Sequence, residues 1–211
     1  MDFDQILTQA GFMTRTVGAI ERDGRPAKTL TTSRAYQTTI EDLWDALTNE
    51  ERIPRWFLPV SGDLELGGGY ALEGNASGSI LECEPPRRFV ITWEYGGDTS
   101  WVTVHLTEEG DETRLDLTHV AHVPEQIWDQ FGPGATGIGW DLGLLGLGLY
   151  LAGKTTSPAT EMAGWEASPQ GKVFVTSASD TWAEASIAAG TDADAAHAAA
   201  KRVTAFYTGA E

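Results

Sequence analysis

The chain has 211 residues, of which 41% are hydrophobic and 21% are charged, so it can bury a substantial core. Its formal net charge is −17 and its basic residues are scattered, which argues against a surface for nucleic acid or for an anionic membrane. The single cysteine, Cys83, excludes an intrachain disulfide and a thiolate zinc cluster, and the four histidines lack metal-site spacing. We therefore expect no metal and no organic cofactor.

The N-terminus is acidic and lacks the basic and then apolar order of a signal peptide. The longest apolar stretch, residues 142–152, is interrupted by glycine and is too short to span a bilayer. These features predict a cytoplasmic protein that binds neither nucleic acid nor membrane.

The first elements expected are a short helix over residues 3–10 and two strands over 14–21 and 27–36. The Asp-Gly pair within residues 22–26 is typical of a tight hairpin between those strands. A helix then begins at Thr38 or Thr39, with an apolar stripe of Leu43, Trp44 and Leu47. A second helical turn over residues 49–56 leads into Trp56 and Phe57.

Residues 63–122 alternate between apolar and polar side chains with a period of two, which predicts an antiparallel meander with one buried face. The period changes to that of a helix after Pro124, and glycines interrupt this helix repeatedly. Each interior glycine costs roughly 0.5–1 kcal/mol relative to alanine, so something is expected to approach the helix backbone closely. A sheet, a ligand and a second helix all remain open as the approaching group.

Residues 154–167 have the composition of a linker. Ser168 and Pro169 are typical of an N-cap followed by Pro at the first helical position, and that helix is expected to end near Gly190. Thr191, with Asp194 three residues later, resembles a capping box for a last helix that stops near Gly209. Both helices have narrow, alanine-rich stripes, so we expect them to pack on the main domain or on a second copy of the chain.

The residues from Leu43 to Thr48 (LWDALT), from Arg52 to Phe57 (RIPRWF), and from Ile80 to Trp93 (ILECEPPRRFVITW) together resemble a known family. The resemblance continues through Thr113-Arg114-Leu115 and the glycine-rich helix, and covers roughly residues 29–153. The chain is similar to the activator-of-heat-shock-protein-90-ATPase-like family of the START and birch-pollen-allergen-like helix-grip superfamily (SRPBCC). The resemblance implies an α+β helix-grip fold, in which a curved antiparallel sheet wraps around one long helix. We expect residues 1–153 to form that domain, with an extra N-terminal hairpin strand, and residues 154–211 to form a linker and a helical extension.

In such a fold the cavity lies between the concave sheet face and the long helix. Strand parity and the helix stripe predict a set of candidate ligand-binding residues: Trp56, Phe57, Trp93, Tyr95, Val104, Leu117, His119, Trp140 and Leu144. These side chains either line a cavity for a flat apolar molecule or fill that space themselves. His119 and Tyr95 are the catalytic candidates, although a lone inward histidine is more often structural. Glu94 and Asp141 supply carboxylates that no spacing brings together.

The resemblance to this superfamily implies three alternative functions. The first is a carrier or sensor that binds a small apolar or aromatic molecule. The second is an enzyme of the polyketide cyclase or hydrolase type that uses the same cavity. The third is a co-chaperone-like module that binds a protein partner, which the acidic surface favours least. A homodimer formed through the glycine-rich helix or the C-terminal pair is a further possibility.

Overall fold

The computed structural model describes residues 13–153 and 164–209. The helix expected over residues 3–10 and the linker residues 154–163 lie outside this range. The chain forms two compact units. Of the described residues, the helical unit comprises 13–32, 122–145 and 164–209, and the sheet unit comprises 33–121 and 146–153. Strand β2 and helix α4 each contribute residues to both units.

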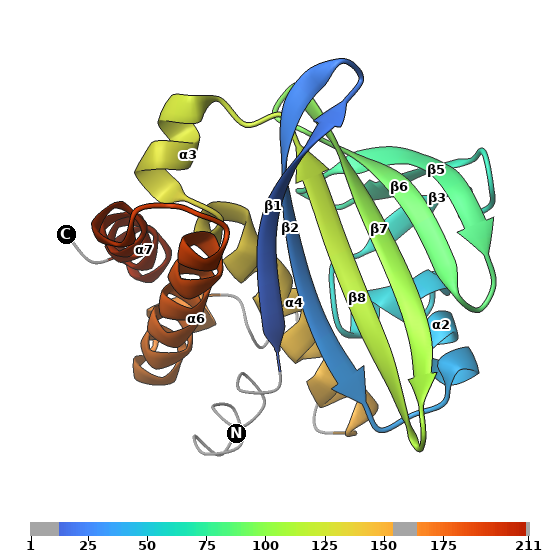
Figure 1. Ribbon diagram of the computed structural model, residues 1–211. Helices are drawn as coiled ribbons and strands as arrows, with labels where there is room; N and C mark the ends of the chain where they lie inside the picture. The colour runs from blue at the N-terminus through green and yellow to red at the C-terminus, as the bar shows by residue number, and fades with distance from the viewer. Residues whose placement is uncertain (1–12, 154–163, 210–211) are drawn as a thin grey trace. The chain divides into compact units, whose positions relative to one another are not determined.

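Eight strands form a single sheet in the order β1-β2-β8-β7-β6-β5-β4-β3 (Figure 1). Their bounds are β1 Thr14–Arg22, β2 Arg25–Tyr36, β3 Val60–Gly62, β4 Gly69–Leu72, β5 Ser77–Glu84, β6 Arg88–Tyr95, β7 Asp98–Glu109 and β8 Glu112–Ala121. The hairpin expected at the Asp-Gly pair is present, with Asp23 and Gly24 both at positive φ, as a tight turn requires. The predicted meander is confirmed by β3 to β8, which pair antiparallel with their neighbours in chain order.

Two short helical elements follow β2 in the sheet unit, α2 (Ile40–Thr48) and the 3-10 turn η1 (Ile53–Arg55). The Thr39 hydroxyl accepts a hydrogen bond from the backbone N–H of Asp42. Of the two expected N-caps, Thr38 and Thr39, the structure therefore has Thr39. Of the predicted stripe, Leu43 is fully buried, while Trp44 and Leu47 are only half-buried. Helix α2 packs against β7 and covers part of the sheet.

Helices α3 (Glu125–Phe131) and α4 (Gly134–Leu151) are separated at Gly132 and Pro133, where the sequence predicted a break. The side chains that approach the α4 backbone explain two of its glycines. A Cβ on Gly137 would collide with the buried indole of Trp182, and a Cβ on Gly148 would collide with the guanidinium of Arg34. The close approach therefore comes from a second helix at Gly137 and from a sheet side chain at Gly148.

The C-terminal part of the helical unit consists of the 3-10 turn η2 (Trp165–Ala167), α6 (Pro169–Ala188) and α7 (Ala193–Thr208). Ser168 caps α6, as predicted, because its hydroxyl accepts from the N–H of Gly171. The expected capping box at Thr191 is wrong by one residue: the N-cap of α7 is Asp192, whose carboxylate accepts from the N–H of Ala195. Helix α6 packs against α7 and against β1, and α7 also contacts α3.

Among the described residues, no helix is both long enough and apolar enough to cross a membrane.

Candidate binding site

The register of three strands places most of the predicted sheet residues on one face. Trp93 on β6 lies opposite Ser100 on β7, Val102 on β7 lies opposite His119 on β8, and Val104 lies opposite Leu117. Side chains directly opposite each other in an antiparallel pair point to the same side of the sheet. We call these six residues the apolar face of β6–β8.

Burial of this face alternates along the strands as predicted. Val102, Val104 and Leu117 are 1%, 3% and 5% exposed, and His119 is 6% exposed. On the opposite face, Thr103 and Thr118 are half-buried, but Val120 is also buried, so the alternation ends there. His105, expected to be exposed on the opposite face, is exposed. Tyr95 has the parity of Trp93 but is 62% exposed, because it sits at the end of β6 opposite Asp98, next to the Gly96-Gly97 turn.

His119 and Ser100 form a polar pair within this apolar surface. The Ser100 hydroxyl donates to the carbonyl oxygen of Trp93 at 3.0 Å, and the Nε2 atom of His119 lies 2.8 Å from the same hydroxyl oxygen. A hydroxyl has one proton, so Ser100 must accept from His119, which places the imidazole proton on Nε2. Burial lowers the pKa of His119 to about 4, so the ring is neutral at physiological pH.

The ring of Trp93 also contacts His119, with centroids 6.5 Å apart and planes tilted by 57°. Trp93 is only half-buried, which makes its indole the accessible aromatic surface of this group. The arrangement offers an aromatic ring and aliphatic side chains beside one neutral imidazole. Chemically, it suits contact with an apolar molecule better than proton transfer, because a pKa near 4 makes His119 a weak base at neutral pH.

The predicted end of the site, Trp56 and Phe57, follows η1. Their rings are stacked with centroids 5.3 Å apart, and both side chains are half-buried. The indole N–H of Trp56 donates to the carbonyl oxygen of Ala46 at 2.9 Å, which fixes this ring against α2. Trp56 and Phe57 thus form an aromatic pair of the sheet unit, held by α2.

Arg34 is a buried cation that the sequence pattern did not single out. It is 5% exposed, its guanidinium lies 4.9 Å from the ring centroid of Tyr36, and it packs over Gly148 of α4. Burial lowers the pKa of Arg34 and raises that of Tyr36. The one signal in the sequence that could have indicated this contact is Gly148 itself, since only a residue without Cβ leaves room for the guanidinium.

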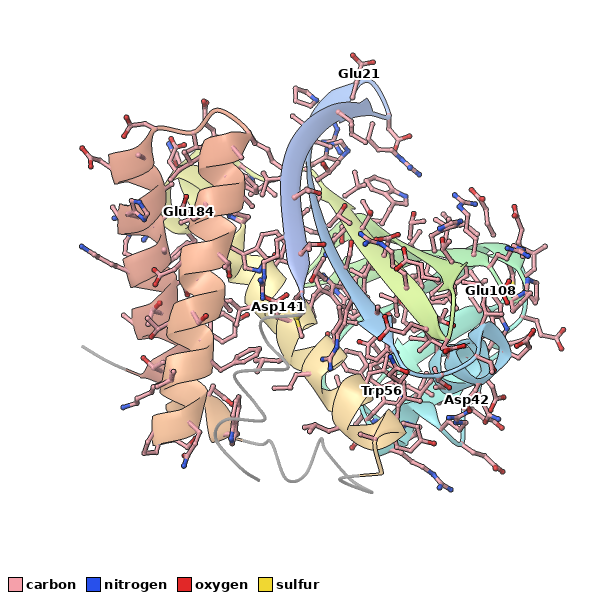
Figure 2. All side chains as sticks on the ribbon, turned by 60° about the horizontal axis from the view of Figure 1, so that its bottom comes forward. Glu21, Asp42, Trp56, Glu108, Asp141 and Glu184 are labelled. Atoms are coloured by element: carbon pink, nitrogen blue, oxygen red, sulfur yellow. The ribbon has the colours of Figure 1, made fainter. Side chains whose placement is uncertain are left out.

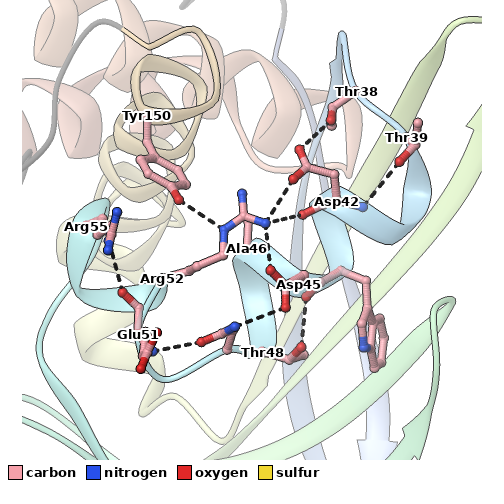
Figure 3. A network of polar contacts seen from close by, with 12 residues as sticks. Thr38, Thr39, Asp42, Asp45, Ala46, Thr48, Glu51, Arg52, Arg55 and Tyr150 are labelled. Atoms are coloured by element: carbon pink, nitrogen blue, oxygen red, sulfur yellow. Dashed lines mark hydrogen bonds and ion pairs between the residues drawn. The ribbon is translucent and has the colours of Figure 1, made fainter.

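A network of polar contacts around Arg52 joins α2 to the last turn of α4 within the sheet unit (Figure 3). Arg52 Nη1 donates to Asp42 at 2.9 Å and to Asp45 at 2.8 Å, and Arg52 Nε donates to the hydroxyl of Tyr150 at 3.0 Å. The hydrogen bond from Arg52, followed by one from Asn49, lowers the pKa of Asp45. These contacts position α2, and with it Trp56.

The helical unit contains the two helix residues of the predicted site and a buried carboxylate. Leu144 is 2% exposed and Trp140 is half-buried. Asp141, between them on α4 (Figure 2), is fully buried and accepts hydrogen bonds from Arg15, Thr32 and Trp182. Burial raises the pKa of Asp141, while Arg15 and the hydrogen bonds act to lower it. The hydrogen-bond partners of Asp141 therefore all belong to its own unit.

Within the described ranges, 13–153 and 164–209, no three His, Cys, Asp or Glu side chains converge as metal ligands would.

Residues 37–151, more than half of the chain, match the family described as "Activator of Hsp90 ATPase homolog 1-like protein". The chain belongs to this family. No curated protein matches the sequence.

Among solved structures, this member of the Activator of Hsp90 ATPase homolog 1-like family is similar to CalU16 from Micromonospora echinospora. The crystal structure of CalU16 is 34% identical, with a TM-score of 0.66, and the match covers 82% of this chain and 97% of CalU16. Its solution NMR structure gives a TM-score of 0.70 over 84% of this chain and 97% of CalU16. DynU16, a protein of the dynemicin biosynthetic locus, is 17% identical, with a TM-score of 0.51 over 69% of this chain and 49% of its own, which shows a shared fold alone.

The family and these neighbours confirm the predicted α+β helix-grip fold, with its additional N-terminal hairpin strand and C-terminal helix pair. The family match ends at residue 151, so α6 and α7 lie outside it. The match to CalU16 covers more of the chain than the family model does. The predicted domain boundary at residue 153 and the cytoplasmic location stay predictions.

Proposed function

We propose that this protein binds a small apolar or aromatic molecule against the apolar face of β6–β8, without a metal or an organic cofactor. The observation that carries the proposal is the combination on that face of aliphatic side chains, a half-buried indole and one neutral imidazole. Trp56 and Phe57 of the sheet unit remain predicted members of this site, and the binding roles of Trp140 and Leu144 stay predictions.

The chemistry of the face defines the ligand class. Val102, Val104 and Leu117 make this face apolar, although the protein's own atoms cover them, and the half-buried ring of Trp93 offers a surface on which a flat ring can stack. The hydrogen bonds of His119 and Ser100 to each other and to the Trp93 carbonyl leave this face without a net charge. An apolar molecule can therefore lie on it without leaving a buried charge unpaired.

A filling substitution tests the proposal. Val104→Trp places an indole on the apolar face, and His105→Trp places the same indole one residue further along β7 on the opposite, exposed face. The parent chain and both variants are purified from the native host, and the compounds that co-purify are extracted and identified by mass spectrometry. We expect one small apolar compound to accompany the parent chain and His105→Trp, and to be depleted from Val104→Trp.

The proposal fails if the parent chain carries no small molecule, or if Val104→Trp retains the compound as well as His105→Trp does. Circular dichroism of both variants checks that Val104→Trp is folded, because overpacking a buried position typically costs 1–3 kcal/mol. If Val104→Trp unfolds, Leu117→Ala replaces it. This change removes apolar contact from the same face and should weaken retention of the compound.

Two other functions stay predictions. An enzyme that uses His119 or Tyr95 would need a group that titrates near neutral pH in contact with substrate, whereas the pKa of His119 is lowered to about 4. A protein-interaction role, including a homodimer, is compatible with membership of the family. No contact of the described residues favours either of them over ligand binding.

A further inference from the structure

We propose that the helical unit contains a second, separate binding site, which takes a compact, neutral aromatic molecule between α3, α6 and α7. A cavity of about 390 Å³ lies there, and its lining comes from α3, the start of α4, α6, α7 and the α6–α7 turn. This volume falls within the range of roughly 300–1,000 Å³ that is typical of small-molecule sites. The proposal does not rest on the function proposed for the sheet unit.

The walls of the cavity are made of short side chains where two helices meet. Ala183 on α6 faces Ala196 and Ala200 on α7, all three are buried, and Ala199 is 5% exposed beside them. Protein interiors are normally close-packed, because an empty volume forfeits dispersion contacts. Here the space remains open, and its base is formed by the fully buried ring of Trp182.

Helix α3 supplies the aromatic rim. None of its side chains is fully buried, although Trp128 and Phe131 both line the cavity. Lys28 of β2 holds the Trp128 ring, with its ammonium 4.9 Å from the ring centroid. Arg202 of α7 donates to the carbonyl oxygens of Gln130 and Asp129, which fastens the C-terminal end of α3 to α7. The rings of Trp128 and Phe131 therefore line the cavity and remain partly accessible.

The polar groups of the lining indicate which ligand charge the cavity favours. The Ser179 hydroxyl, 1% exposed, accepts a hydrogen bond from Thr204 and can donate its own proton into the cavity. Ser186 and Thr191 share a hydrogen bond at 2.8 Å. The lining contains no Lys or Arg, and its one charged residue is Asp129, so an anionic ligand is disfavoured. A neutral ring compound that carries one hydrogen-bond acceptor fits this set.

This cavity is distinct from the apolar face of β6–β8. All of its lining residues belong to the helical unit, and those of α6 and α7 follow residue 151, where the family match ends. A ligand here would therefore be recognised by residues that the family pattern does not include.

The test uses the full-length chain labelled with ¹⁵N and 2-naphthol as the probe. The eight indole N–H signals are assigned by single Trp→Phe changes, and their shifts are followed during titration. We expect saturable shifts at Trp128 and Trp182, with a dissociation constant at or below about 1 mM for a ligand of this size. Absence of saturation, or shifts confined to Trp93, would overturn the proposal.

Matched variants locate the probe. Ala196→Phe fills the cavity and should abolish the shifts at Trp128, while Ala193→Phe, an exposed position on the same helix that does not line the cavity, should leave them unchanged. Unaltered affinity in Ala196→Phe contradicts the site. If that variant is misfolded, Ser179→Ala decides the matter: loss of one hydrogen bond should weaken binding about fivefold, and an unchanged dissociation constant counts against the site.

Discussion

The indole N–H of Trp182 donates a hydrogen bond to the carboxylate of Asp141 at 2.9 Å, although 41 residues separate the two in the sequence. Both side chains are fully buried. The same carboxylate also accepts from Arg15 at 2.9 Å and from Thr32 at 3.1 Å. One aspartate therefore ties α4 to α6, β1 and β2, and a buried carboxylate is tolerated because each of its oxygens has a donor.

Removal of this carboxylate should destabilise the protein strongly. Asp141→Ala leaves the guanidinium of Arg15, whose side chain is only 4% exposed, without its ion-pair partner. Breaking a buried ion pair from one side typically costs 3–5 kcal/mol. Chemical denaturation monitored by tryptophan fluorescence should show this loss in the free energy of unfolding.

Asp116→Ala is the control, because Asp116 pairs with Arg114 at 2.9 Å, but the two side chains are 29% and 38% exposed, far more than those of Asp141 and Arg15. A surface pair contributes about 0–1 kcal/mol, so this variant should unfold nearly as the parent chain does. If Asp141→Ala and Asp116→Ala lowered the free energy of unfolding by the same amount, burial would not explain how much Asp141 stabilises the protein.

Two glycines of α4 should respond to alanine in opposite directions. A Cβ on Gly137 would clash with the indole of Trp182, which is fully buried and held by Asp141, so Gly137→Ala should destabilise by about 1–3 kcal/mol. A Cβ on Gly139 would meet only the hydroxyl of Tyr207, at an ordinary 3.6 Å. Gly139→Ala should therefore stabilise the helix, by up to about 1 kcal/mol. Thermal unfolding of both variants checks the prediction, and the same sign for both would contradict it.

The sequence predicted the sheet well because its information is local. Alternation along β7 and β8 correctly placed Val104, Leu117 and His119 on one buried face, and the glycine and proline breaks correctly separated α3 from α4. The error at the start of α7 is of the same local kind. Thr191 and Asp192 are adjacent residues with similar capping ability, and the backbone of the turn decides between them.

The long-range contacts could not have been predicted from periodicity. Asp141 and Arg15 are 126 residues apart, and no spacing rule joins a helix carboxylate to a strand guanidinium. The contact between Arg34 and Gly148 is similar, since the glycine indicated a close approach but not the approaching group. Tyr95 shows that strand parity is also limited. Tyr95 has the same parity as Trp93, but parity does not tell whether a side chain at the end of a strand is covered, and Tyr95 is exposed.

The network around Arg52 should contribute modestly to stability. Its guanidinium bonds to Asp42, Asp45 and Tyr150, but the two carboxylates are about half exposed, so solvent screens the ion pairs. Arg52→Ala should cost about 1–2 kcal/mol in urea denaturation, because several hydrogen bonds are lost together. Arg55→Ala removes a neighbouring exposed arginine that bonds only to the carbonyl oxygen of Glu51 among its described contacts, and should change stability by less than about 0.5 kcal/mol. A loss as small for Arg52 as for Arg55 would contradict the role assigned to this network.

His119 should make the stability of the protein depend on pH in the weakly acidic range. Its pKa is about 4 when folded and about 6.5 in the unfolded chain. Between these values the unfolded state binds the proton and the folded state does not, so stability falls as pH decreases from 6.5 toward 4. Between pH 7 and pH 5 the loss from this one group should be about 2 kcal/mol.

The measurement is urea denaturation of the parent chain and of His119→Gln at pH 7 and pH 5. Glutamine keeps a donor for Ser100 but does not titrate, so the variant reports the acid sensitivity of all other groups. The difference between the two chains in their loss of stability from pH 7 to pH 5 then isolates the imidazole. An identical loss in both chains would mean that His119 can be protonated in the folded state at little cost, which would contradict its burial against Ser100 and Trp93.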